Sequence, residues 1–280
     1  MPGGGSTVDV LMITYNAPDY VRLSLPRLLE SCDDEVRVWL WQNGDDEETL
    51  ETTRAHADDA RVFRFHHSRQ NVGVTAPTNW LWSEGDAAFV SKVDDDCLLP
   101  VDWIDRLRTA HAADARFGAL GASRLRPDDI DDGLVAKKLE RYGDVQIFRN
   151  NWVQGSGYLM RRAMVARRGA LQEGEGFTNY CLALALEGAI HGFPYPFVFE
   201  DHMDDPRSQH TLIKTDADLA WRMPLSINRS NVRTVADWER QMRRSALEVQ
   251  TAPLDPAQWV GWRRKVRNLK RKMDDRRRAR

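Results

Sequence analysis

The chain has 280 residues, of which 42% are hydrophobic and 29% charged, a composition typical of globular proteins. No apolar run approaches the roughly 20 residues that cross a bilayer, and the scattered Cys32, Cys97 and Cys181 exclude a disulfide framework or a structural zinc site. The formal net charge of −2 combines an acidic body with a basic C-terminal segment. Together with an N-terminus that lacks the features of a secretion signal, these properties predict a cytoplasmic protein.

The first half of the chain alternates between short apolar runs and segments with helical spacing. The runs 8–15, 36–41, 61–66 and 87–93 predict strands, and the segments 20–32, 45–57 and 76–84 predict helices. Because such alternation inserts a helix between successive strands, it predicts an α/β fold with a Rossmann-like, mainly parallel sheet flanked by helices.

The second half is less regular. We predict a helix over about 100–113 and a strand over 119–125, followed by a polar loop or small insertion at 126–150. Strand-like segments at 152–163 and 193–200 flank a predicted helix at 181–190. From 235 onward the chain is predicted to be helical and increasingly basic.

Three consecutive carboxylates, Asp94, Asp95 and Asp96, follow the apolar strand 87–93. Side chains alternate along a strand, so Asp94 and Asp96 point the same way while Asp95 points to the opposite side, toward backbone groups. Two carboxylates at the carboxyl end of a strand suit a hard cation such as Mg²⁺ or Mn²⁺. The alternative is an acidic turn that caps the next helix.

Five ordered segments carry a family resemblance. They are Ile13-Thr14-Tyr15-Asn16, Trp41-Gln42-Asn43-Gly44-Asp45, Asn71-Val72-Gly73, Lys92-Val93-Asp94-Asp95-Asp96, and Gln154-Gly155-Ser156-Gly157 with Arg161-Arg162. In this order they resemble the motifs of the inverting glycosyltransferase family 2, whose members transfer sugars from nucleoside diphosphates and have the GT-A fold. The resemblance covers about residues 8–210.

The resemblance implies a domain organisation and an activity. A GT-A domain would span 1–232, with a nucleotide-sugar half at about 8–116 and an acceptor half at about 117–232, and a helical basic extension would follow at 233–280. The activity would be a metal-dependent transfer, with Mn²⁺ or Mg²⁺, of a sugar from a nucleoside-diphosphate sugar to a hydroxyl acceptor. Glycans, lipid-linked saccharides and small-molecule natural products are the expected acceptors.

The same resemblance implies the site residues. Asp94, Asp96 and His202 would bind the metal. The donor nucleotide would be bound by Thr14, Tyr15, Asn16, Gln42, Asp45, Asn71, Gly73, Lys92, Asp94 and Asp95.

Two departures from the family pattern concern the base of the nucleotide and the catalytic base. Gln42 stands where the family has an Asp that contacts uracil, so the donor need not carry uridine, and Asp45 is a substitute. The segment 179–184 lacks the family's catalytic carboxylate. An inverting transfer needs a general base. The candidates are Glu173 and Glu175 before the predicted late helix and Asp201 beside His202, of which Glu175 and Asp201 remain as alternatives.

Two other functions remain open on the sequence. One is a catalytically inactive protein of the same fold that binds a glycan or a membrane. The other is a sugar-phosphate nucleotidyltransferase, although the loop 16–19 lacks the glycine-rich sequence usual in those enzymes.

The segment 263–280 contains eleven Lys or Arg residues and two Asp residues, a net charge of +9 that leaves −11 for the remainder. An apolar stripe accompanies this charge, formed by Trp259, Trp262, Val266, Leu269 and Met273. Through 259–280 we expect contact with an anionic membrane surface, which would place the protein peripherally at the inner face of the membrane. A helix packed on the domain or a solvated terminus are the alternatives, and nucleic acid is an unlikely partner because no nucleic-acid-binding fold accompanies the charge.

Overall fold

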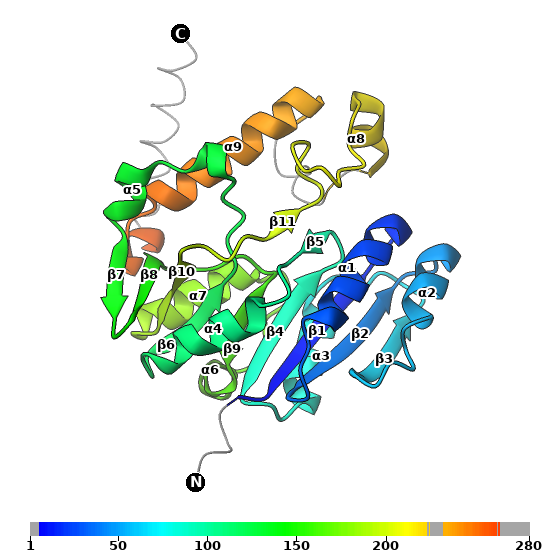
Figure 1. Ribbon diagram of the computed structural model, residues 1–280, viewed down its shortest axis with the longest axis horizontal. Coiled ribbons are helices and arrows are strands. Elements are labelled where there is room, and N and C mark those ends of the chain that lie inside the picture. Colours follow the sequence, from blue (N-terminus) through cyan, green and yellow to red (C-terminus); the bar gives the residue numbers. More distant parts are fainter. Residues whose placement is uncertain (1–5, 223, 225–231, 262, 264–280) are drawn as a thin grey trace.

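A mixed sheet of nine strands organises the part of the chain that the computed structural model describes, residues 6–222, 224, 232–261 and 263. The strands are β1 (Val8–Thr14), β2 (Val36–Asn43), β3 (Val62–Ser68), β4 (Phe89–Asp94), β6 (Phe117–Gly121), β7 (Leu139–Tyr142), β8 (Val145–Asn150), β9 (Tyr158–Arg161) and β10 (Ile190–Tyr195). Their order is β3-β2-β1-β4-β9-β6-β10-β8-β7 (Figure 1). Because β1 to β4 pair in parallel and β6 pairs in parallel with β10, the predicted mainly parallel α/β fold is confirmed.

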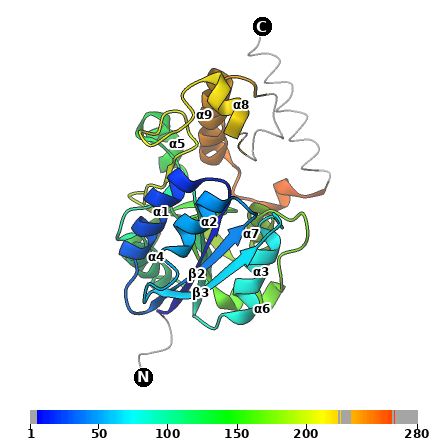
Figure 2. The same cartoon turned by 90° about the vertical axis from the view of Figure 1, so that its right-hand side faces the viewer.

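Helices cover both faces of the sheet. The helices that flank the sheet are α1 (Pro18–Glu30), α2 (Glu47–Arg54), α3 (Thr75–Glu84), α4 (Trp103–Ala112), α6 (Arg162–Arg168) and α7 (Phe177–Leu186). Figure 2 shows α1 and α4 on one face and α3, α6 and α7 on the other. Each face of the sheet forms a hydrophobic core with its helices, and alternate residues of β1 contribute to the two cores. Val10 and Met12 pack toward α1 and α4. Leu11 and Ile13 pack toward the helices on the opposite face.

A small ribbon and several short elements lie beyond the carboxyl ends of the central strands. The ribbon pairs β5 (Cys97–Leu98) with β11 (Asp201–His202) in an antiparallel arrangement. Figure 1 shows α8 (Asp216–Arg222) and α9 (Val235–Thr251) above this ribbon, and α5 (Asp132–Ala136) beside α9. Trp238 of α9 donates a hydrogen bond from Nε1 to the carbonyl of Asp204 (2.7 Å), which ties the helix to the loop after β11.

The C-terminal prediction falls mainly outside the described residues. Trp259, in the 3₁₀ helix η3 (Pro256–Trp259), packs edge-on against Trp152 with ring centroids 4.3 Å apart. Of the predicted apolar stripe, Trp262 and the members beyond 263 lie outside the described part of the chain, so the membrane-binding helix stays a prediction, as does the division at 232/233. Among the described residues, no helix combines the length and hydropathy needed to span a membrane.

The prediction of a loop at 126–150 is wrong. The 3₁₀ helix η1 (Pro127–Asp129) and α5 lead into a hairpin of β7 and β8, whose β8 strand pairs with β10 at the edge of the sheet. A two-residue turn, Gly143-Asp144, joins the strands, and Gly143 has φ +55°. Glycine adopts this left-handed conformation without steric cost, so a Gly-Asp pair between strand-like residues was the available signal.

The strand predictions at 152–163 and 193–200 are each partly wrong. Only the end of the first segment forms a strand, β9, and the chain turns directly into α6 at Arg162. The second strand, β10, begins and ends earlier than predicted. Apolar composition marked both regions as buried, but it did not fix where pairing begins and ends.

Candidate active site

The aspartate triplet lies at the carboxyl edge of the sheet, beside the loop after β1. Asp94 pairs in register with Ile13, so the ends of β4 and β1 are adjacent. The backbone N–H of Tyr15 donates to Oδ2 of Asp95 (2.8 Å), which confirms that Asp95 turns toward the backbone. On the other side, the N–H of Asp94 donates to Oγ of Ser156 (3.1 Å). The two bonds hold the triplet between the first loop and the segment before β9.

Asp96 is the centre of a candidate cation site. Single ligand atoms of Asp96, His202 and Asp204 all lie within 4.8 Å of one another, and a second such group contains Asp94, Asp96 and Cys97. Oδ2 of Asp96 is 3.2 Å from Nε2 of His202. Carboxylate oxygens with one imidazole nitrogen suit Mn²⁺ and also Mg²⁺. The residues therefore fit the divalent cation that the sequence predicts.

Burial and mutual charge set the protonation of this cluster. Burial and the charge of Asp96 raise the pKa of Asp95, and burial with the same charge raises the pKa of Asp204. For Asp96, burial opposes ionisation, but His202 and Arg124 outweigh it and hold its pKa below the usual range. The pKa of His202 is raised, because Asp96 and Asp204 outweigh burial and the charge of Arg124. The cluster thus concentrates negative charge on Asp96.

A pocket of about 380 Å³ opens beside the triplet, at the ends of β1 and β2. Tyr15, Asn16, Asp45 and Asn71, all predicted nucleotide contacts, line it, together with Gly44, Asp46 and Arg69. Gly44 has φ +99°, and a Cβ there would lie 3.2 Å from the Tyr15 ring. The pocket has the position and the polar groups expected of a nucleoside site.

Thr14 and Gln42, by contrast, lie under this pocket. Both are fully buried, and Oγ1 of Thr14 donates to Oε1 of Gln42 (2.5 Å). The Gln42 amide donates in turn to the carbonyl of Gly44 (3.4 Å). In this structure the two side chains are buried behind the Gly44 loop and do not line the pocket. They therefore expose no surface through which they could make the predicted direct contacts with the nucleotide.

The other predicted nucleotide contacts also have structural partners. Buried Asn43 clamps the 71–73 loop, since its amide donates to Oδ1 of Asn71 (2.8 Å) and to the carbonyl of Gly73 (3.1 Å). Gly73 has φ +72°, which favours glycine. Lys92 is nearly buried and forms an ion pair with Asp94. Asn71 alone of this group lines the pocket.

The family can now be assigned. The sequence model for Glycosyl transferase family 2 matches residues 9–173, more than half of the chain. The chain belongs to glycosyltransferase family 2. Its match includes the pocket-lining residues and the whole aspartate triplet. No functionally curated protein matches the sequence of this glycosyltransferase.

Solved structures of similar fold include a mannosyltransferase. The mannosyltransferase PcManGT from Pyrobaculum calidifontis, in complex with GDP-Man and Mn²⁺, has 17% identity and a TM-score of 0.60, over 91% of this chain and 79% of its own. TarS 1-349 from S. aureus in complex with UDP-GlcNAc has 11% identity and a TM-score of 0.53, over 90% and 75% of the two chains. At these identities the likeness shows the fold, and it confirms the predicted GT-A architecture.

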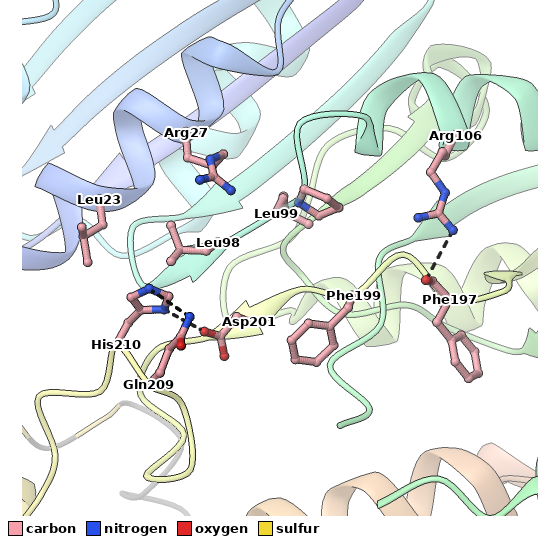
Figure 3. Close-up of a pocket in the computed structure, with 11 residues that line it drawn as sticks. Leu23, Arg27, Leu98, Leu99, Arg106, Phe197, Phe199, Asp201, Gln209 and His210 are labelled. Carbon is pink, nitrogen blue, oxygen red and sulfur yellow. Dashed lines mark hydrogen bonds and ion pairs between the residues drawn. The ribbon is translucent and has the colours of Figure 1, made fainter. Parts of the chain in front are cut away.

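Asp201, one of the two predicted bases of this glycosyltransferase, lies on the opposite side of the ribbon from the cation cluster. Neighbouring strand residues point to opposite faces, so His202 turns to Asp96 and Asp201 turns away. Figure 3 shows Asp201 beside His210 in a second cavity of about 560 Å³, between α1, α4 and the ribbon. Its Oδ2 accepts from Ser208 (2.8 Å) and lies 3.1 Å from Nδ1 of His210. This geometry does not support Asp201 as the base.

Glu175, the other predicted base, lies in the loop before α7. Arg168 binds both oxygens of its carboxylate. The loop leads to Phe177, whose ring stacks on Tyr158 at 4.0 Å, next to the segment that bonds Asp94. Glu175 thus lies two residues before a ring that packs next to the segment holding Asp94, and Arg168 holds its carboxylate.

Three residues of the site were not predicted as such from the sequence. Asp204 joins the cation cluster, and Arg124 lies 3.7 Å from Asp94 and binds the buried Glu200. The sequence signal for Asp204 was its position two residues after His202. Arg124 follows a strand with no motif around it, so its role depends on tertiary contacts alone.

Proposed function

We propose that this family 2 glycosyltransferase transfers a sugar, with inversion and with the aid of a divalent cation, from a nucleoside diphosphate to a hydroxyl acceptor. The observation that carries the proposal is the hydrogen bond between the Tyr15 N–H and Asp95, which joins the loop that lines the pocket to the aspartate triplet and its candidate cation site. PcManGT is in complex with GDP-Man and Mn²⁺, and TarS with UDP and with UDP-GlcNAc. These ligands support the same donor class here.

In this proposal Asp94, Asp96 and His202 hold Mn²⁺ or Mg²⁺. When bound, the cation neutralises charge that develops on the departing diphosphate. Asp95 fixes the loop that bears Tyr15, so the pocket and the cluster keep a fixed separation. The nucleoside part of the donor would then occupy the pocket, and the diphosphate would be directed to the candidate cation site around Asp96.

For the general base we favour Glu175 over Asp201. Asp201 faces the second cavity, whereas Glu175 lies two residues before Phe177, whose ring stacks on Tyr158 next to the segment that contacts Asp94. Arg168 contacts both oxygens of the Glu175 carboxylate and so fixes its position.

The acceptor, the two-domain division at 232/233 and a peripheral membrane role for 259–280 are extensions of the proposal. A basic C-terminal segment of net charge +9 suits an acceptor carried at an anionic membrane surface. A soluble glycan or a small-molecule natural product would not need that segment. Removal of 264–280 would therefore reduce transfer to a lipid-linked acceptor and spare transfer to a soluble one.

The test is donor turnover. UDP-glucose, UDP-GlcNAc and GDP-mannose are each incubated with the protein and Mn²⁺, and release of the nucleoside diphosphate is followed with and without EDTA. We expect EDTA-sensitive release of the nucleoside diphosphate from at least one donor. NMR of the sugar product, recorded early in the reaction, should show an anomeric configuration inverted relative to that of the donor. Pyrophosphate release from an NTP and a sugar phosphate would instead indicate a nucleotidyltransferase. An absence of both activities would favour the inactive binding protein.

A further inference from the structure

The inference concerns Arg124, which no sequence motif includes, and it rests on the proposed function. Arg124 is anchored by Glu200, a carboxylate with no exposed surface. Nε of Arg124 donates to Oε1 of Glu200 (2.6 Å). Gly157 makes room for this pair, since a Cβ at that position would lie 2.2 Å from Oε2 of Glu200. The fold therefore fixes the guanidinium through a buried ion pair.

The free end of the guanidinium points to the aspartate triplet. Nη2 of Arg124 donates to Sγ of Cys97 (3.2 Å) and lies 3.7 Å from Oδ2 of Asp94. Within the described residues Nη1 has no hydrogen-bond partner, and it is not buried. Of the five N–H donors of an arginine, those on Nη1 are thus available to a ligand at the cation cluster.

An anionic ligand at that point needs a positive charge beside it. Asp94, Asp96 and Asp204 surround the site with carboxylates, and a nucleoside diphosphate adds further negative charge. The side chain of Lys92 is 9% exposed and paired with Asp94. That of Arg124 is paired with Glu200 and Asp94 but is 26% exposed, so it is the more accessible of the two to a ligand. A planar guanidinium with free donors matches phosphate oxygens well.

We propose that Arg124 binds the diphosphate of the nucleotide-sugar donor and that Glu200 positions it for this contact. The guanidinium supplies a fixed positive charge on the side of the triplet that faces the second half of the sheet. It stays in place when the cation leaves, because its anchor is Glu200 and not the cation.

The experiment compares ligands with and without a diphosphate. UDP and GDP are titrated calorimetrically against wild type and Arg124→Met, with Mn²⁺ and again in EDTA. Uridine and guanosine are compared by ligand-detected NMR, which tolerates weak binding. We expect Arg124→Met to lower the affinity for the nucleoside diphosphate by roughly tenfold or more, both with Mn²⁺ and in EDTA. The affinity for the matching nucleoside should change by less than about twofold. Arg124→Lys keeps the positive charge but lacks the planar, bidentate guanidinium, so it should lose less affinity for the diphosphate than Arg124→Met.

A fold control is needed because Arg124→Met leaves Glu200 buried and unpaired. The double variant Arg124→Met/Glu200→Gln removes both charges, and its melting temperature should exceed that of Arg124→Met. If the double variant binds the diphosphate like wild type, or if nucleoside binding falls equally, Arg124 is only structural and the inference is overturned. If wild type binds neither UDP nor GDP, the proposed function fails first and the inference falls with it.

Discussion

Nε2 of His202 lies 3.2 Å from Oδ2 of Asp96, although 106 residues separate the two in the sequence. The β5–β11 ribbon creates this proximity, because it pairs His202 with Cys97 directly after the aspartate triplet. The ribbon thereby adds an imidazole, and Asp204 beyond it, to carboxylates at the end of β4. The candidate cation site is thus made from two distant segments, the end of β4 and the loop that Trp238 of α9 contacts.

The first prediction concerns this imidazole. His202→Gln removes the nitrogen ligand while preserving the side chain's capacity to hydrogen bond, so Mn²⁺ affinity should fall by about tenfold or more. Electron paramagnetic resonance of free Mn²⁺ during a titration measures the change. Asp102→Asn, which alters an exposed carboxylate outside the cluster, should bind Mn²⁺ like wild type. Equal affinity for the His202 variant would remove His202 from the site.

The second prediction separates the candidate bases. Glu175→Gln should lower kcat for transfer by roughly 100-fold or more, as expected for loss of a general base. Asp201→Asn should change kcat by much less, because its side chain faces the second cavity (Figure 3). Glu173→Gln, an exposed neighbour in the same loop, is the matched control and should be neutral. A large loss confined to Asp201→Asn would reverse the assignment.

The third prediction concerns Gly157 as a stability determinant. Gly157 has φ +60°, and an added Cβ would collide with buried Glu200, so Gly157→Ala should cost more than about 2 kcal/mol of unfolding free energy. Gly155→Ala is the control, because its Cβ would meet Phe177 at an ordinary 3.6 Å. Urea unfolding of both variants measures the difference. Similar stability of the two would show that the Glu200 site adapts to the added methyl group.

The fourth prediction concerns acid stability. His191 is fully buried, and burial lowers its pKa from 6.5 to about 4. The unfolded state thus binds more protons than the native state between these values, and stability is lost as the pH falls below 6.5. This histidine should account for about 2 kcal/mol of lost stability between pH 7 and pH 5, at about 1.4 kcal/mol per pKa unit.

His191→Gln tests that prediction. The amide can still accept the hydrogen bond that the Ala119 N–H donates to Nδ1 of His191 (3.0 Å), but it does not titrate. Urea unfolding at pH 7 and pH 5 should give a smaller decrease for the variant by about 2 kcal/mol. An identical decrease in both proteins would assign the acid sensitivity to other groups.

Much of the fold and the centre of the site could be predicted from the sequence. Apolar runs of strand length gave β1 to β4. The alternation expected of a strand also separated Asp95 from Asp94 and Asp96, although β4 itself ends at Asp94. The buried positions of Thr14 and Gln42 could not be predicted, because a polar residue at a strand end can face the pocket or the interior. Only the packing of α2, whose Thr53 donates to Oγ1 of Thr14 (3.1 Å), decides between them.

Which face of β11 each of its residues occupies could likewise not be predicted from the sequence. Whether Asp201 or His202 faces the cluster depends on the register of a strand of two residues, too short for any periodic pattern. Arg124 joins the site only through tertiary contacts, with Glu200, Cys97 and Asp94. Such contacts leave no local signal in one sequence.

The central claim is a cation-dependent nucleotide site at Asp96, and one calorimetric comparison tests it most directly. UDP and GDP are titrated into wild type and Asp96→Ala, each with Mn²⁺ and with EDTA, after both proteins show the same unfolding midpoint. We predict that wild type binds at least one of the two nucleotides in Mn²⁺ and much more weakly in EDTA, and that Asp96→Ala loses the gain from Mn²⁺. Binding that is equal with and without Mn²⁺, or unchanged in Asp96→Ala, would contradict the account.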